Sequence, residues 1–411
     1  MSSHRRLASA ALGLAAALLW PRLGAAQLPA LTFEEALARA RQRAPAVVEA
    51  QGRVAEAQGP VAGAAPFLRA NPVLEAEVGP RTRVDGARGI DVAVGLTQPL
   101  ELAGQQGARR DAARAGLSAE QQRQRDTERR VVGEAAEAFL RALHAQERLG
   151  LARQAEEAAR ETASSTQRRL DAGDVPRVDV NVARVALARA RADVADAEGD
   201  AEATLGALRL VLGLGPEVPL EPKGELRALA SRPVNAPSEA RARPDLAALE
   251  AEVTRAEAEL RLGRGEAWPD LGVGVRYQRE ADETAVLGTL SVPLPLFARG
   301  QETRVTAEAR VQRMSSALEA ARRSREVSLA SARALDRKRQ EAVVLLEQEA
   351  LPLLDENAAL ARRAYEVGEM GLAEFLLVRR DTRDTRAAWL DALLLAALAR
   401  VQLAVEMGVL P

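Results

Sequence analysis

Cysteine is absent from this chain of 411 residues, and histidine occurs only twice, as His4 and His144. Without cysteine, the chain has no disulfides, no thiol chemistry and no cysteine-ligated metal site. Histidine metal sites need a cluster of ligands, so we expect His144, alone in a long helical segment, to be structural or solvated. We therefore expect no bound metal and no cofactor.

Aromatic residues make up only 2% of the chain, too few for two or three ordinary globular cores. Ala, Leu, Arg, Glu and Gln dominate instead, which favours long helices. The formal net charge of −1 excludes a globally basic nucleic-acid binder, so we expect no nucleic-acid partner. The sequence contains no Ser/His/Asp set, phosphate loop or metal motif, and its carboxylates fit paired helix surfaces. An enzyme is therefore not expected.

The first 26 residues have the layout of a secretory signal peptide. Two arginines precede an apolar run, 7–20, and small residues lead to a cleavage site after Ala26. Beyond this segment we find no stretch of the roughly 18 apolar residues that a membrane-spanning helix needs. The longest candidate, 392–399, is interrupted by Arg400. We expect an exported chain that is either soluble or enters a membrane as β-strands.

Proline and glycine landmarks recur in one order, with separations of 194 to 199 residues. The matched landmarks are Arg43-Ala44-Pro45 with Ala242-Arg243-Pro244, Asn71-Pro72 with Trp268-Pro269, Pro99-Leu100-Glu101-Leu102 with Pro293-Leu294-Pro295-Leu296, Gly104-Gln105 with Gly300-Gln301, Gly173 with Gly368, and Gly213 with Gly408. Because proline and glycine punctuate structure, this order predicts an internal duplication. We divide the chain into a signal peptide (1–26), a first repeat (27–212), a Pro- and Gly-rich linker (213–241) and a second repeat (242–411).

Each repeat begins with a helix of moderate length, 32–58 or 244–263. In the first of these helices, Thr32 and Glu35 form a capping box. Short segments of alternating polarity follow in each repeat and predict β-hairpins. The strongest are 89–98 and 270–279, and their weaker partners are 71–79 and 285–293.

Two very long helical runs follow the hairpins, 104–170 and 300–365, each about 100 Å long at 1.5 Å per residue. The end of the second run has a heptad pattern that predicts a coiled coil. The pattern steps by four and three residues through Leu346, Ala350, Leu353, Asn357, Leu360, Ala364 and Val367. Turns at Gly173 and Gly368 end the runs, and another long helix returns from each.

Four strands of nine or ten residues, apolar on one face, suit a tilted membrane barrel. The alternative is a pair of soluble hairpins packed on helices. Four strands cannot close a barrel, because the smallest have about eight, and open edges are not tolerated in lipid. If the strands span a membrane, several chains must share one barrel. The long helices then continue the cylinder into the periplasm.

At this point the sequence resembles the TolC outer-membrane efflux family over essentially its whole mature length, about 31–409. The resemblance rests on two turn motifs and two strand-to-helix junctions. They are YEVGEMGLAE at 365–374, LDAGDVPRVD at 170–179, QPLE at 98–101 and PLPLF at 293–297. The resemblance implies a mostly α fold with a membrane β-barrel contribution. It also implies a homotrimer whose three chains share one twelve-stranded barrel in the lipid of the outer membrane, with the helices extending into the periplasm.

The resemblance also implies a periplasmic gate at the turns between the long helices. Tyr365 matches a gate tyrosine, and Glu374 matches an acidic position of a constriction ring that attracts cations. Asp179 ends the corresponding motif of the first repeat and joins the gate set. Met370 stands where a gate arginine is expected, and Leu377 where a second acid is expected, so closure need not rest on an arginine network. The alternative is that these residues only pack and solvate a helix turn.

The same turns are expected to dock a periplasmic adaptor protein that links the duct to an inner-membrane pump of the RND class. The docking residues are Gly173, Val175, Val367, Gly368 and Met370. The stretch 96–110 resembles the CzcC branch, which serves cation-exporting pumps, while drug efflux remains open. A periplasmic adaptor would show one helical hairpin flanked by β-rich domains, and a filamentous coiled coil would not need the paired strands. These are the alternatives to the function that the resemblance implies, an outer-membrane channel of a tripartite efflux system that passively conducts substrates from the periplasm to the exterior.

Overall fold

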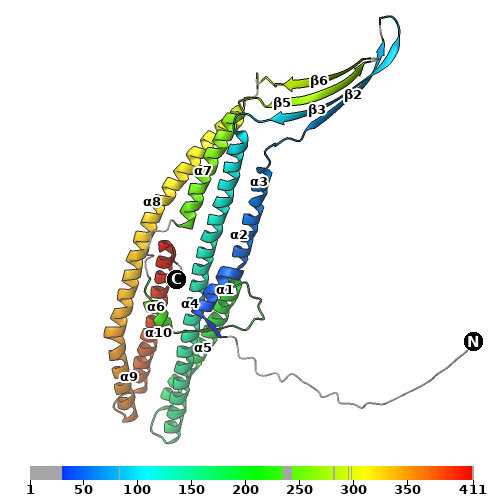
Figure 1. Ribbon diagram of the computed structural model, residues 1–411. Helices are drawn as coiled ribbons and strands as arrows, with labels where there is room; N and C mark the ends of the chain where they lie inside the picture. The colour runs from blue at the N-terminus through cyan, green and yellow to red at the C-terminus, as the bar shows by residue number, and fades with distance from the viewer. Residues whose placement is uncertain are drawn as a thin grey trace, which may run out of the picture.

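The computed structural model describes residues 30–82, 84–234, 243–280, 283–294, 296–297 and 299–409. The predicted signal peptide and the last part of the predicted linker lie outside these residues. Long helices dominate, and a single four-stranded sheet stands at one end of them (Figure 1). Two helical hairpin turns form the other end. Short helices and a two-stranded sheet surround the middle.

The first half of the chain contains β1 (Ala30–Thr32), α1 (Phe33–Arg43), α2 (Pro45–Glu56), α3 (Gln58–Gly63), β2 (Val73–Thr82), β3 (Arg88–Leu100), α4 (Gln105–Asp171) and α5 (Arg177–Val211). The second half contains α7 (Pro244–Gly265), β5 (Leu271–Glu280), β6 (Glu283–Ser291), α8 (Gln301–Leu345), the π-helical turn η1 (Leu346–Ala350), α9 (Leu351–Glu366) and α10 (Leu372–Met407). Between them lie β4 (Glu221–Lys223) and α6 (Leu226–Ser231). β1 and β4 pair in parallel, so the segment between the two halves contacts the residues that directly precede α1.

The predicted helix 32–58 is divided into α1, α2 and α3. Its capping box is present: the Glu35 amide donates to the Thr32 hydroxyl, and the Thr32 amide donates to the Glu35 carboxylate. The break falls at Ala44, which is extended because Pro45 follows it and the residue before a proline disfavours the α region. The helix start was therefore predicted correctly, and its continuity was not.

α4 runs unbroken for 67 residues, about 100 Å at 1.5 Å per residue. The four glycines inside the predicted run do not interrupt it. One of them, Gly133, lets α10 approach closely: a Cβ built at this position would lie 2.7 Å from Val405 Cγ2. The helix is most buried around this contact, near its middle.

The heptad predicted for 346–367 does not form a seam within the chain. Leu353, Leu360 and Val367 are exposed. At η1 the amide of Leu351 bonds the carbonyl of Leu346 five residues back, and Pro352 follows at the start of α9. A π-turn inserts one extra residue and rotates the following helix face by about 100°. The turn therefore shifts the register between Leu346 and the later positions of the pattern.

The four-stranded sheet has the order β2-β3-β5-β6, with every neighbouring pair antiparallel. Each predicted strand is present, and the hairpin connections are shorter than predicted because pairing extends to Thr82↔Arg88 and Glu280↔Glu283. β3 and β5 pair in the centre, so the two halves of the chain meet there. β2 and β6 are the two edges of this sheet.

Three glycine pairs from the predicted repeat share one conformation. They adopt positive φ at matching positions: Gly104 and Gly300 before α4 and α8, Gly173 and Gly368 in the hairpin turns, and Gly213 and Gly408 after α5 and α10. Left-handed backbone is routine only for glycine. The conformation thus explains why glycine stands at each of these landmarks.

The main core lies at the middle of the molecule, where α1, α4, α5, α6 and α10 meet. Phe33 packs edge-on against Phe139, with ring centroids 5.6 Å apart. By length and composition, α10 could cross a membrane. The sequence analysis had predicted no such stretch after the signal peptide. The apolarity of α10 is explained by this core, because Leu393 and Ala396 are almost fully buried there.

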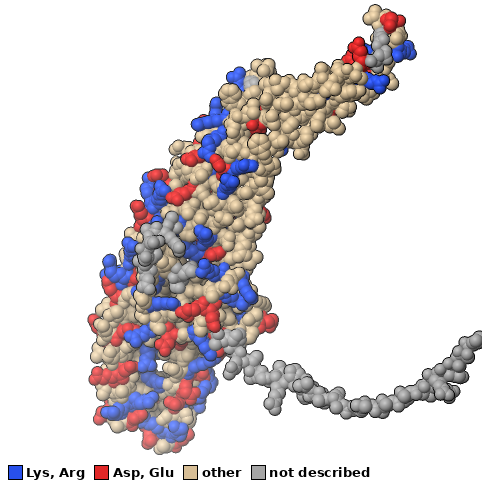
Figure 2. Space-filling view, viewed as in Figure 1, with Lys and Arg blue, Asp and Glu red and all other residues tan. Residues whose placement is uncertain are grey.

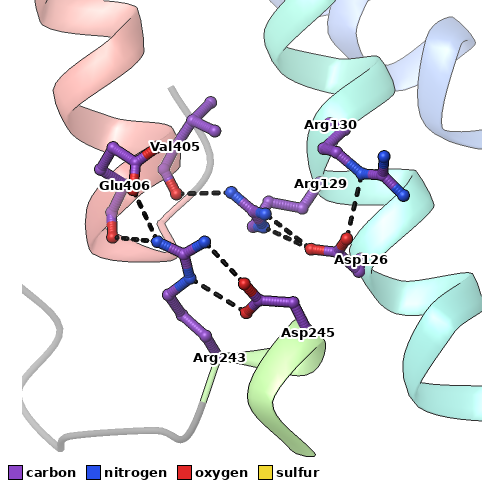
Figure 3. Close-up of polar contacts among 7 residues, drawn as sticks. All are labelled: Asp126, Arg129, Arg130, Arg243, Asp245, Val405 and Glu406. Atoms are coloured by element: carbon purple, nitrogen blue, oxygen red, sulfur yellow. Dashed lines mark hydrogen bonds and ion pairs between the residues drawn. The ribbon is translucent and has the colours of Figure 1, made fainter. Parts of the chain in front are cut away.

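A polar network fixes the upper end of α10 beside this core (Figure 3). Arg243, just before α7, donates to both oxygens of Asp245 at 3.0 and 2.7 Å and to Glu406 of α10 at 2.7 Å. Arg129 of α4 donates to Asp126 and, at 2.7 Å, to the carbonyl of Val405. Burial acts to raise the pKa of Asp245, but the hydrogen bonds and charge of Arg243 outweigh it and hold that pKa below its usual value.

Candidate functional site

The two hairpin turns at the far end of the helices have the same backbone. Gly173 follows α4 with φ 85° and Gly368 follows α9 with φ 81°. The next residue bonds back across each turn: Asp174 N donates to Arg169 O at 2.8 Å, and Glu369 N donates to Ala364 O at 2.9 Å. These are Schellman-type helix ends. Both glycines, predicted for adaptor docking, are exposed at the tips.

Tyr365, the predicted gate tyrosine, lies on the last turn of α9. Its ring stacks on Phe375 of α10, with centroids 4.6 Å apart and planes 5° apart. Its hydroxyl lies 3.5 Å from the hydroxyl of Thr166 on α4, and the Arg169 guanidinium lies over its ring. The side chain thus touches both helical hairpins, α4–α5 and α9–α10. The sequence had not assigned a role to Phe375 or Thr166.

Arg379 of α10 makes a second contact between the hairpins. No pattern in the sequence indicated this contact. The guanidinium of Arg379 donates to the carbonyl of Ala158 at 3.0 Å and to the hydroxyl of Thr162 at 3.1 Å, both on α4. It also lies over the Phe375 ring. Burial, and then the charge of Arg362, lowers its pKa from the usual value. No local pattern distinguishes Arg379 from the other arginines of 379–386.

The predicted gate carboxylates stand on the first turns of the returning helices, Asp179 on α5 and Glu374 on α10. A carboxylate is favourable there, because the helix N-terminus carries partial positive charge. Glu374 is exposed, and Asp179 is half-buried. Within the described residues neither side chain forms a hydrogen bond or ion pair, so a single chain does not bring them into one site with Tyr365.

A groove of about 1300 Å³ separates the hairpins near their tips. Apolar side chains of α5 and α10 line it, among them Val178, Val182 and Leu377. Leu377, which occupies a position where the family resemblance places an acid, thus lines this groove. The predicted docking residues Val175, Val367 and Met370 lie on the tips next to it, and Val367 is 65% exposed.

The groove is also lined by many arginines. They are Arg189, Arg362, Arg363, Arg379, Arg380, Arg383 and Arg386, against Asp193 and Glu366. Arg383 pairs with Asp193, and Arg386 pairs with Asp355 outside the groove. The local charge is therefore positive, while the chain as a whole is close to neutral.

The sheet has one apolar and one polar face, as its alternating sequence predicts. Directly paired residues point to the same side of a sheet. The apolar face is formed by every second residue of all four strands, including Leu74, Val78, Ile90, Val92, Val94, Leu96, Val273, Val275, Tyr277, Val286 and Leu290. Many of these side chains are exposed, so no other described part of the chain covers this face. Figure 2 shows a largely uncharged surface over the sheet.

The opposite face is polar and carries ion pairs that cross the strands. Arg276 of β5 reaches over Gly95 of β3 to pair with Glu77 of β2. Arg81 pairs with Glu280 at 2.8 Å and with Asp91 at 3.5 Å. The other acids on this face are Glu75 and Glu283. Five carboxylates thus stand against two arginines among its described positions, which makes the face acidic.

His144 was expected to be structural or solvated and not a metal ligand. Its Nε2 lies 2.7 Å from Asp391 Oδ1, in the middle of the molecule. Over the part of the chain that the structure describes, no group of three or more His, Cys, Asp or Glu residues is arranged to hold a metal ion.

A family model described as "Outer membrane efflux protein" matches residues 35–214 and 236–409. The cobalt-zinc-cadmium resistance protein CzcC of Cupriavidus metallidurans is 29% identical over 302 residues, covering 72% of each chain. The protein CyaE of Bordetella pertussis is 29% identical over 343 residues, covering 79% of this chain and 72% of its own. Among solved structures, CusC, which forms a transmembrane channel, superposes with a TM-score of 0.77 at 20% identity. The match covers 92% of both chains. The open MtrE outer membrane channel of Neisseria gonorrhoeae gives a TM-score of 0.71 at 18% identity, covering 92% of this chain and 89% of its own.

Proposed function

The chain belongs to the outer membrane efflux protein family, and from this membership we propose how its copies assemble, conduct and close. It is an outer-membrane channel component of a tripartite efflux system, with a periplasmic extension. We assign three copies to the working channel, two efflux repeats to each copy (27–212 and 242–411), and residues 213–241 to the equatorial link between the repeats.

The observation that carries the assembly is the sheet with two unpaired edges, β2 and β6, and one uncovered apolar face. Lipid does not tolerate open strand edges, so the edges must pair with other copies. Any closed barrel then contains a multiple of four strands, and family resemblance selects twelve. The apolar face contacts lipid, and the acidic face lines the lumen.

The helices extend the same duct into the periplasm. Leu353 and Leu360 of α9 and Val367 at its C-cap form an exposed apolar row, and a neighbouring copy is its proposed partner. The turns at Gly173 and Gly368 face the pump. There Tyr365, Asp179 and Glu374 form the gate, and a periplasmic adaptor docks on Gly173, Val175, Val367, Gly368 and Met370, linking the duct to an RND-type pump.

The duct works passively, because its family relatives are channel proteins and not enzymes. The preference of the duct for ions of one sign then depends on the charge along its wall. The acidic sheet face and a symmetric ring of Glu374 both favour cations. This agrees with a cargo of heavy-metal cations, the class named for the CzcC relative.

Assembly is tested by placing cysteines on the two edges of the sheet, at Val78 of β2 and Val286 of β6, in the naturally cysteine-free chain. Oxidation should produce dimers and closed trimers in purified outer membranes when both cysteines are present, and at most dimers with either one alone. A double variant that remains monomeric in the outer membrane, or that separates with the soluble periplasmic proteins, would contradict the shared barrel.

A further inference from the structure

Exposed large apolar side chains mark the junctions between the sheet and the helices. Phe67 precedes β2, Leu102 follows β3, Trp268 precedes β5 and Phe297 follows β6. The three aromatic side chains, Phe67, Trp268 and Phe297, are 82%, 69% and 89% exposed. The whole chain has only ten aromatic residues, so three exposed ones at these junctions are a marked concentration. Aromatic side chains favour the boundary between lipid and water.

A groove of about 710 Å³ lies at this level, next to Trp268. Its apolar lining is Leu102, Trp268, Pro269, Leu271 and Val292. By strand alternation Leu271 lies on the same side as Val273 and Val275, and Val292 directly follows the last residue of β6. The wall of the groove therefore continues the apolar face of the sheet.

Two arginines from the end of α7, Arg261 and Arg264, also line the groove. Arg261 is partly neutralised by Asp111 of α4, with Nη2 and Oδ2 2.9 Å apart. Arg264 is exposed, and its side chain has no hydrogen bond or ion pair with any other described residue. The groove thus presents a cationic end towards the helices and an apolar wall towards the sheet.

We propose that this groove binds a glycerophospholipid of the leaflet that borders the helices, with its phosphate at Arg264 and an acyl chain along Leu271 and Val292. This inference rests on the proposed contact of the apolar sheet face with lipid. A guanidinium matches phosphate geometry with two parallel hydrogen bonds, and the apolar wall accommodates an alkyl chain. The order from helices to sheet, charge and then apolar surface, is the order of a lipid from headgroup to acyl chain.

Lipid retention tests the proposal on the full-length oligomer, purified in mild detergent and weighed by native mass spectrometry. The wild type should retain phospholipid, Arg264→Gln should retain at least five-fold less, and Arg264→Lys should be intermediate. Arg333→Gln is the matched control, because Arg333 is also exposed on a helix without a described side-chain partner, far from the sheet. Equal retention by Arg264→Gln and wild type would overturn the site. Displacement of the lipid by millimolar inorganic phosphate would also overturn it, because the groove would then be a simple anion site.

Trp268 fluorescence locates the groove relative to the bilayer. Trp389→Phe leaves Trp268 as the single tryptophan after the predicted signal peptide. In vesicles of phospholipid brominated near the glycerol end of the acyl chain, its emission should be quenched more than in vesicles brominated near the methyl end. Equal or absent quenching would contradict the placement. Conductance of the same preparations separates the two ideas: lipid retention without conductance contradicts the channel, and conductance without lipid retention contradicts the lipid site.

Discussion

The rings of Tyr365 and Phe375 lie parallel, with centroids 4.6 Å apart, across the turn that joins α9 to α10. Tyr365 is half-buried, and its hydroxyl lies 3.5 Å from the hydroxyl of Thr166 on the other hairpin. Phe375 is buried. The pair therefore links the shape of one hairpin turn to the contact between hairpins. Tyr365 is one of the three residues of the proposed gate, and its contacts can be tested one side chain at a time.

Replacing Phe375 with leucine should keep most of the burial and remove the stacking. An aromatic pair contributes about 0.5–1.5 kcal/mol beyond its buried area, so we expect a lower thermal stability and more frequent opening in planar bilayers. Tyr365→Phe keeps the stacking and loses only a long hydroxyl contact, so it should stay close to wild type. If Tyr365→Phe opened the channel more than Phe375→Leu, the hydroxyl and not the stacking would hold the gate.

Arg379→Gln should loosen the contact between α10 and α4. Hydrogen bonds from a charged donor contribute about 1.5–3 kcal/mol, and Arg379 makes two of them across the hairpins. We expect single-channel conductance to rise at least two-fold, with Arg379→Lys in between. Arg380→Gln is the control, because its ion pair with Asp384 stays within α10. Equal effects of the two glutamine variants would show that the contact of Arg379 with α4 does not hold the hairpins together.

Glu374→Gln should lower the preference of the channel for cations, because it removes one exposed carboxylate per copy near the turn. The reversal potential in a potassium chloride gradient across a planar bilayer measures this preference. Glu369→Gln, in the turn itself, is the control for loss of charge at the tip. A reversal potential that is unchanged in Glu374→Gln would mean that selection resides elsewhere, for example on the acidic face of the sheet.

Gly133→Ala should destabilise the middle of the molecule by about 1–3 kcal/mol, because its Cβ would meet the stiff side chain of Val405 at 2.7 Å. Adding Val405→Ala should recover part of this loss, which a double-mutant cycle by thermal unfolding would reveal. Gly150→Ala on the same helix has open space around it and should be neutral or stabilising. Additive effects of the two substitutions at 133 and 405 would contradict the contact.

Asp245→Asn should reduce stability most at neutral pH. Arg243 holds the pKa of Asp245 below its usual value, so this carboxylate stabilises the folded state above the unfolded pKa of about 3.9. The contribution is lost as pH falls through the lower, folded pKa. The difference in melting temperature between wild type and variant should therefore be full at pH 7 and shrink below about pH 4. A difference that grew on acidification would show that another group controls the network.

The sequence determined the local structure because local structure depends on short-range preferences. Period-two alternation located all four strands, and glycine marked the positions where the backbone must take positive φ. The capping box located the start of α1. The order of these signals, repeated once, was enough to indicate the family and its channel function, and to point to Tyr365 and the two hairpin turns.

Only the tertiary structure decided which side chains meet across helices. The chain has 57 Lys and Arg residues, and their local contexts are too alike to single out Arg379, Arg243 or Arg264. The π-helical turn before Pro352 changes the register of the predicted heptad, which no count along the sequence detects. These outcomes depend on how α4, α7 and α10 pack over long distances, because a contact between residues hundreds of positions apart leaves no periodic signal in either segment.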